Sequence, residues 1–93
     1  MKPIAWSPEK NETLRAQRGI SFEDIVFHIQ AGDIIETYDH PNQGRYPDQQ
    51  IHEIEIEGYV YLVPFVESEE EVFLKTIIPS RKATNKRRGA KHE

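Results

Sequence analysis

The strongest constraint on the fold is the stretch of residues 58–78, in which two apolar runs flank an acidic turn. The runs, residues 59–66 and 72–78, are rich in β-branched and aromatic side chains, which favour packed strands. The turn between them, residues 67–71, carries four glutamates that belong in solvent. This pattern predicts an antiparallel β-hairpin. Pro64 lies inside the first run and lacks a backbone donor, which predicts an edge, a bulge or an outward-facing position there.

Two helices are predicted ahead of this hairpin. Ser7 and Pro8 begin the first, because serine caps a helix and proline fits its first position, and Gly19 ends it. Ser21 caps the second, which ends near residue 31. The second helix carries an apolar stripe at three- and four-residue spacing, made of Phe22, Ile25, Val26 and Ile29. We therefore expect this helix to cover the sheet.

Two further strands are predicted between the helices and the hairpin. Residues 33–38 form a short strand, and residues 50–56 alternate so that one face is wet. Residues 39–48 form a loop, and residues 57 and 58 form a two-residue turn. The predicted fold is α+β, with two N-terminal helices packed on a four-stranded antiparallel sheet. Residues 1–80 form this single domain, and residues 81–93 form a basic C-terminal tail that is a short helix or disordered.

Composition excludes several classes of protein. The 93 residues include no cysteine, which excludes disulfides and thiolate chemistry. No apolar run approaches the ~20 residues that span a bilayer. The N-terminus lacks the apolar core of a signal peptide, so we expect a cytoplasmic protein without membrane contact. Residues 1–78 carry six Lys or Arg against fifteen Asp or Glu, and residues 79–93 carry six against one. The basic end is open to two interpretations, a solvated extension or a phosphate-binding arm.

The histidines and alternating glutamates give little support for metal chemistry. The four histidines are His28, His40, His52 and His92, and their spacing fits no metal motif, so no metal or other cofactor is predicted. His52, on a strand beside the basic region, is a candidate general acid or base, with an ordinary strand histidine as the alternative. His28 is expected to be a surface or partly buried helix residue. The glutamates of residues 53–57 are expected to form a solvated strand face.

Cations next to aromatic side chains favour RNA as a ligand. Arg81 and Lys82 are predicted to bind phosphate and stabilise transition-state charge, and Lys75 is a further candidate. Tyr59 and Tyr61 are predicted to stack on bases, and Lys75 is expected on their face of the sheet. The cations expected to add affinity for the RNA backbone are Lys86, Arg87 and Arg88. RNA cleavage by such a set needs no metal if the 2′-hydroxyl is held in line with the scissile bond.

Two segments carry the pattern of a known family. The first is Ile4-Ala5-Trp6-Ser7-Pro8-Glu9-Lys10-Asn11, followed by Arg18-Gly19-Ile20-Ser21-Phe22-Glu23-Asp24. The second is Thr76-Ile77-Ile78-Pro79-Ser80-Arg81-Lys82-Ala83-Thr84. Together they resemble the opening aromatic residue and Lys-Asn pair, the helix boundary and the closing strand of the BrnT family, toxins of bacterial type II toxin–antitoxin systems.

This resemblance implies a RelE-like ribonuclease fold and a toxin that inhibits growth by cutting RNA. It also implies a ribbon-helix-helix antitoxin as partner, in a heterotetramer that contacts DNA only through the antitoxin. Two other functions remain open from the sequence. One is a non-catalytic module that binds protein or nucleic acid, and the other is a structural protein that self-associates through its hairpin.

Overall fold

The structure, a computed structural model, describes residues 2–91, and its first two helices begin and end where the capping residues predicted. The elements in chain order are β1 (Ile4–Ala5), α1 (Pro8–Arg18), α2 (Phe22–Gln30), β2 (Ile34–Asp39), β3 (Gln49–Ile56), β4 (Tyr59–Glu67), β5 (Val72–Leu74), β6 (Ile78–Pro79) and α3 (Arg81–Lys91). Ser7 caps α1, and Gly19 ends it in the left-handed conformation at φ 66°. Ser21 and Asp24 form a reciprocal capping box on α2. The two predicted helices are confirmed.

The α+β class is confirmed, but the predicted sheet of four antiparallel strands was wrong. The sheet has six strands in the order β1-β5-β4-β3-β2, with β6 pairing β4 off this path. Strand β1 pairs with β5 in the parallel sense, whereas the other pairs are antiparallel. Two residues are too short to give a period-2 signal, so the sequence pattern did not reveal β1.

Pro64 accounts for the other difference in the sheet. The predicted strand of residues 72–78 is divided into β5 and β6, which pair with different parts of β4. Between them the amide of Lys75 donates to the carbonyl of Pro64 at 2.8 Å, and proline has no N–H to return the bond. Leu74 pairs with Phe65 and Ile78 with Leu62, so three residues oppose two and form a bulge.

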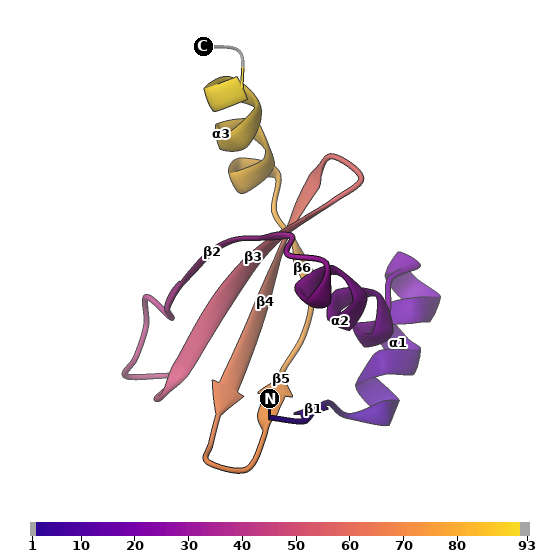
Figure 1. The fold of residues 1–93 in the computed structure, drawn as a ribbon, viewed down its shortest axis with the longest axis vertical. Coiled ribbons are helices and arrows are strands. Elements are labelled where there is room, and N and C mark those ends of the chain that lie inside the picture. The colour runs from indigo at the N-terminus through magenta and orange to yellow at the C-terminus, as the bar shows by residue number, and fades with distance from the viewer. Residues whose placement is uncertain (1, 92–93) are drawn as a thin grey trace.

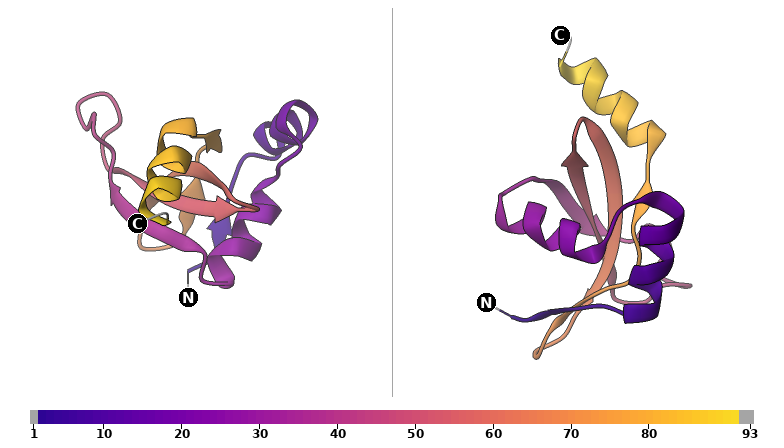
Figure 2. Two further views of the ribbon diagram at one scale, coloured as in Figure 1. Left: turned by 90° about the horizontal axis from the view of Figure 1, so that it is seen from above. Right: turned by 90° about the vertical axis from the view of Figure 1, so that its right-hand side faces the viewer.

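Helix α2 lies over one face of the sheet with α1 beside it (Figures 1 and 2). The core cluster draws on both helices and the central strands, and its fully buried members are Phe22, Ile25, Ile54, Val63, Leu74 and Ile77. Trp6, from the entry to α1, stacks on Phe22 with ring centroids 5.7 Å apart. The apolar stripe of α2 therefore covers the sheet, as its spacing predicted.

The basic end of the chain forms helix α3 at the end of the sheet where β3 turns into β4 (Figure 1). The turn at Glu57 and Gly58 has positive φ at both residues, 51° and 83°, which is the predicted two-residue hairpin turn. The hydroxyl of Thr84 is buried and accepts a hydrogen bond from the amide of Val60 at 2.8 Å.

The last two residues of the predicted tail, 92 and 93, lie outside the described part of the chain. Among residues 2–91, no helix is both long and apolar enough to cross a membrane.

Replacing Thr84 with valine is expected to loosen α3 from the sheet. Valine keeps the shape of threonine but leaves the buried amide of Val60 without its acceptor, which costs about 1–3 kcal/mol. Hydrogen exchange should then accelerate at the Val60 amide and along α3, while the amides of α2 keep their protection. Thr13→Val, a matched change on the exposed face of α1, should leave both regions as they are. Unchanged exchange at Val60 would contradict this role for Thr84.

Candidate active site

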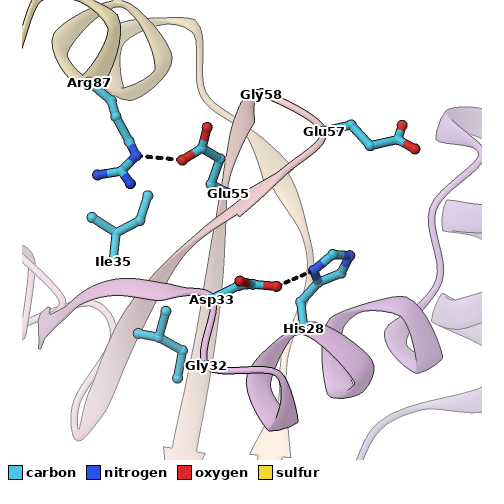
Figure 3. A pocket seen from close by; sticks show the side chains of 9 residues that line it. His28, Gly32, Asp33, Ile35, Glu55, Glu57, Gly58 and Arg87 are labelled. Carbon is cyan, nitrogen blue, oxygen red and sulfur yellow. Dashed lines mark hydrogen bonds and ion pairs between the residues drawn. The ribbon is translucent and has the colours of Figure 1, made fainter. Parts of the chain in front are cut away.

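A polar pocket of about 380 Å³ lies where α2, the start of β2, the β3–β4 turn and α3 meet (Figure 3). It is lined by His28, Gly32, Asp33, Ile34, Ile35, Glu55, Glu57, Gly58 and Arg87. Its volume falls in the range of ~300–1,000 Å³ that is usual for small-ligand sites. We call it the polar pocket, because two charged or ionisable pairs approach it from different sides.

The first pair is His28 with Asp33. The imidazole Nδ1 lies 2.7 Å from the carboxylate Oδ2, and the histidine side chain is only 22% exposed. The chain brings the two together at the end of α2, where the amide of Asp33 donates to the carbonyl of His28 at 3.0 Å. A carboxylate on Nδ1 favours the tautomer that carries its proton there, which leaves Nε2 free to accept or deliver a proton. Figure 3 shows this second nitrogen turned away from Asp33.

The second pair is Arg87 with Glu55. Arg87 lies on the face of α3 that packs toward the sheet, and its Nε is 2.5 Å from Glu55 Oε1 on β3. The terminal nitrogens of Arg87 point away from Glu55, toward Ile35 (Figure 3). Because a guanidinium has five N–H donors, the Nε contact leaves the terminal nitrogens available to hold an anion. Glu55 thus orients a cation whose remaining donors face the pocket.

A second hollow of about 490 Å³ adjoins the polar pocket and shares His28 and Glu57 with it. Its other lining residues are Arg18, Gly19, Ile20, Asp24, Phe27, Ile56 and Tyr61. One terminal nitrogen of Arg18 donates a hydrogen bond to the carbonyl of Ile77 at 2.9 Å. We call this the adjoining hollow. Tyr61 and Phe27 line it next to His28 of the first pair, so it offers aromatic side chains there.

The structure brings four of the residues predicted to bind RNA toward this region. Tyr61 lines the adjoining hollow, and Tyr59 lies beside it with ring centroids 5.6 Å apart. Arg87 enters the polar pocket itself. Arg88 lies close to the β3–β4 turn, beside Gly58 and Val60.

Other predicted residues lie on the outer face of the sheet. Lys82 and Lys86 line an outer hollow of about 360 Å³ together with Glu36, Tyr38, Glu53, Leu62, Ser80 and Ala83. The pKa of Tyr38 is raised to about 12, mainly by burial and to a lesser extent by a 2.8 Å hydrogen bond to Glu53. This phenol therefore stays protonated at neutral pH. Arg81 is exposed as the first residue of α3.

Lys75 was expected on the same face as Tyr59 and Tyr61, and this placement was wrong. Its amide bonds to Pro64, so Lys75 lies opposite Pro64 and on the face away from both tyrosines. Its ammonium instead lies 5.4 Å from the centre of the Phe73 ring. The length of the acidic turn sets this register, and a shift of one residue moves a side chain to the other face.

His52 contacts side chains of the strands on either side of it. It pairs with Val63 and stacks on the Phe65 ring at a centroid distance of 4.1 Å, while its Nδ1 lies 2.7 Å from the hydroxyl of Thr37. Burial lowers the pKa of His52, so its neutral form is favoured at neutral pH. The structure therefore favours the ordinary strand histidine that was the alternative for this residue.

Sequence reasoning missed His28 and Asp33 as a pair. Neither sits in a motif, and a histidine in the last turn of a helix is usually explained by the helix dipole. The available signal was their five-residue separation across the helix end, which lets the chain fold back on itself. Within residues 2–91 no group of three or more His, Asp or Glu side chains is arranged to hold a metal ion.

The comparisons with known proteins yield one family and no named relative. The family model described as a domain of unknown function (DUF4258) matches residues 11–79. No curated protein and no solved structure matches the chain. The matched segment runs from the middle of α1 through β6, so it includes His28, Asp33 and Glu55 and ends before α3.

Proposed function

The chain belongs to the DUF4258 family, a domain of unknown function, and we propose its activity from the polar pocket. It is a BrnT-like toxin with a RelE-like fold that inhibits growth by cleaving RNA without a metal ion. It acts in the cytoplasm and is neutralised by a ribbon-helix-helix antitoxin in a heterotetramer, which contacts DNA only through the antitoxin. The resemblance of residues 4–24 and 76–84 to that family is the starting point of this proposal.

One observation carries the proposal: the basic helix α3 places Arg87 in the same pocket as the His28–Asp33 pair. Cleavage of RNA without a metal needs a group that moves a proton and a cation that stabilises the charged phosphorus centre. The pocket supplies one of each, and both are held by a carboxylate partner. Tyr61 in the adjoining hollow supplies an aromatic surface for an unpaired base.

The exposed cations of α3 extend the binding surface beyond the pocket. Arg81 and Lys82 lie in the first turn of α3, where Ser80 caps the helix by accepting from the amide of Ala83 at 3.1 Å. Backbone donors and the helix dipole at such an end favour phosphate. Lys86 and Arg88 add charge on the same helix. We assign these four cations to binding the RNA backbone, and we assign the chemistry to the pocket.

The proposal is tested by incubating the purified protein with a single-stranded RNA oligonucleotide in the presence of a chelator. We expect cleavage that leaves a 2′,3′-cyclic phosphate and a 5′-hydroxyl, because the neighbouring 2′-oxygen is the nucleophile. A single 2′-deoxy nucleotide at the cleaved position should abolish cleavage there. Inducible expression in bacteria should arrest growth with loss of intact RNA, and the variant Arg81→Ala/Lys82→Ala should relieve the arrest. Intact RNA in both settings would contradict the proposal.

A non-catalytic binding module is the second candidate, and the exposed Phe27 favours it. This side chain is 66% exposed and lines the adjoining hollow, so a partner that docks in the hollow would bury it. The same incubation separates the two functions. RNA that is bound in a strongly salt-dependent manner but never cut would support the binding module.

A further inference from the structure

We propose that the adjoining hollow binds one guanine base of the RNA, with Glu57 and Arg18 bonded to the edge of the base and Tyr61 stacked on its face. The inference rests on the RNA ligand of the proposed function and deepens it, because it names the base that the RNA must carry. It is carried by the juxtaposition, around one hollow, of a carboxylate with no partner among residues 2–91, an anchored guanidinium and two aromatic side chains.

The lining of the hollow suits a flat aromatic ring. Ile20 belongs to the core and Ile56 packs against it, so these two side chains form the inner wall. Tyr61 from β4 and Phe27 from α2 add aromatic side chains from two different elements. Phe27 is largely exposed, so a base placed against it removes apolar surface from water. Stacking on such side chains is the usual way in which proteins hold unpaired RNA bases.

The charges around the hollow favour a neutral ring over a phosphate. Two carboxylates, Asp24 and Glu57, line it together with one permanent cation, Arg18. A phosphate in the hollow would be repelled by both carboxylates. A neutral base with N–H donors would instead bond to a carboxylate, because an ionised carboxylate only accepts hydrogen bonds.

Glu57 is the carboxylate that remains available for a ligand. One oxygen of Asp24 already accepts from the amide of Ser21 at 2.9 Å in the capping box of α2. Glu57 lies on the exposed β3–β4 turn, and its carboxylate has no hydrogen bond or ion pair within residues 2–91. Figure 3 shows its side chain turned away from Arg87. The carboxylate that lacks a partner is therefore one that lines the hollow.

Guanine is the base whose edge matches Glu57 and Arg18. Its N1–H and its 2-amino group lie side by side, so they can donate together to the two oxygens of Glu57. Its O6 and N7 accept from arginine. Arg18 uses one terminal nitrogen on the carbonyl of Ile77, and its other donors remain for the base. Adenine presents an acceptor at N1, and cytosine and uracil lack the two adjacent donors, so a carboxylate discriminates against all three.

The first test measures binding without cleavage. The probe is a fluorescent 2′-fluoro oligouridine, which has no 2′-hydroxyl to attack the phosphate, with guanine, inosine, 7-deazaguanine or adenine at its central position. By fluorescence anisotropy, guanine should bind about 5- to 100-fold more tightly than adenine, which is the usual discrimination of a bidentate contact. Inosine lacks the 2-amino group and should bind about 10-fold more weakly than guanine. 7-Deazaguanine lacks the N7 acceptor for Arg18 and should also bind more weakly than guanine.

Substitutions assign the preference to the hollow. Glu57→Gln removes the charge from an exposed turn and should bind guanine and inosine equally. Glu70→Gln, the same change on the acidic turn of residues 67–71, should keep the preference of the wild type. Tyr61→Leu should weaken the binding of all four probes by about 5- to 100-fold through lost stacking, whereas Tyr61→Phe keeps the ring and should bind as the wild type does.

Cleavage maps separate this inference from the proposed function. The sites that the protein cuts in a natural RNA should share a guanine at one fixed position, and Glu57→Gln should cut without that preference. Cleavage next to all four bases alike would overturn the guanine site while the ribonuclease stands. Guanine-selective binding without cleavage would overturn the ribonuclease and support the guanine site. Equal affinity of the folded wild type for guanine, inosine and adenine probes would overturn the guanine site.

Discussion

RNA cleavage should fall by about 10²- to 10³-fold when Arg87 is replaced by alanine, which is the usual effect of removing one donor that stabilises transition-state charge. Arg87 lies on α3 and lines the polar pocket, as His28 does from α2. Its Nε contact with Glu55 fixes the guanidinium plane, and its terminal nitrogens are turned away from Glu55, toward Ile35 (Figure 3), so they stay available to bind a phosphate. The loss should appear mainly in kcat, because the charge on the phosphorus oxygens is greatest in the transition state.

This loss should not come from unfolding. The side chains of Arg87 and Glu55 are 40% and 21% exposed, and a pair that is partly in solvent contributes at most about 1 kcal/mol. The thermal midpoint of Arg87→Ala should therefore lie within several degrees of the wild type. Arg87→Lys should remain impaired, because a lysine ammonium keeps the charge but lacks the planar fork that bonds Glu55 and phosphate together.

Two other arginines serve as comparisons for Arg87. Arg45→Ala removes the same charge from the loop of residues 39–48 and should leave cleavage unchanged. Arg88→Ala removes an exposed cation next to Arg87 and should raise KM with little effect on kcat. Equal losses of kcat in Arg87→Ala and Arg88→Ala would show that α3 contributes general charge rather than a placed donor.

Replacing Asn11 with alanine should be the most destabilising single change to a polar side chain. Asn11 is 5% exposed on α1, and its amide oxygen accepts from the amide of Phe22 at 2.7 Å while its amide nitrogen donates to Glu23 at 2.8 Å. Alanine would leave the buried N–H of Phe22 without a partner and remove the donor to a carboxylate. We expect a loss of about 2–4 kcal/mol in the free energy of unfolding, measured by urea titration.

The two hydrogen bonds of Asn11 can be separated by a second substitution. Asn11→Asp can still accept from Phe22, but it places a second carboxylate against Glu23 instead of a donor. The donated bond from Asn11 is the main cause that lowers the pKa of Glu23, so this variant should raise that pKa toward its ordinary value or above it. Asn85→Ala makes the same chemical change at an exposed position of α3 and should stay within about 0.5 kcal/mol of the wild type. A similar loss in both alanine variants would contradict the role of Asn11.

Asn11 also shows why part of the fold escaped the sequence analysis. In a helix with few apolar residues, the sequence does not distinguish a buried asparagine from an exposed one. Only the partners of Asn11 across the α1–α2 junction reveal that it joins the two helices. The split of the last strand was anticipated only as one of three consequences of Pro64. The parallel pairing of β1 with β5 joins residues far apart in the chain, and no local pattern signals such a pair.

The sequence alone determined the elements whose causes are local. Ser7 and Ser21 begin their helices through bonds within three residues, and positive φ at residues 57 and 58 makes the hairpin turn. The same is true of the apolar stripe of α2, because its period follows from helix geometry. These features depend on a few neighbouring residues, so they can be read before the chain is folded.

Only the tertiary structure decided which polar side chains meet. Arg87 and Glu55 are 32 residues apart, and their contact requires α3 to dock beside the β3–β4 turn through Thr84. His28 and Asp33 are close in sequence, but the pocket they face is built by β3 and α3. The charge pattern could identify a basic end, and it could not say which of its cations would line the same pocket as a histidine. That choice depends on register and docking, which long-range packing sets.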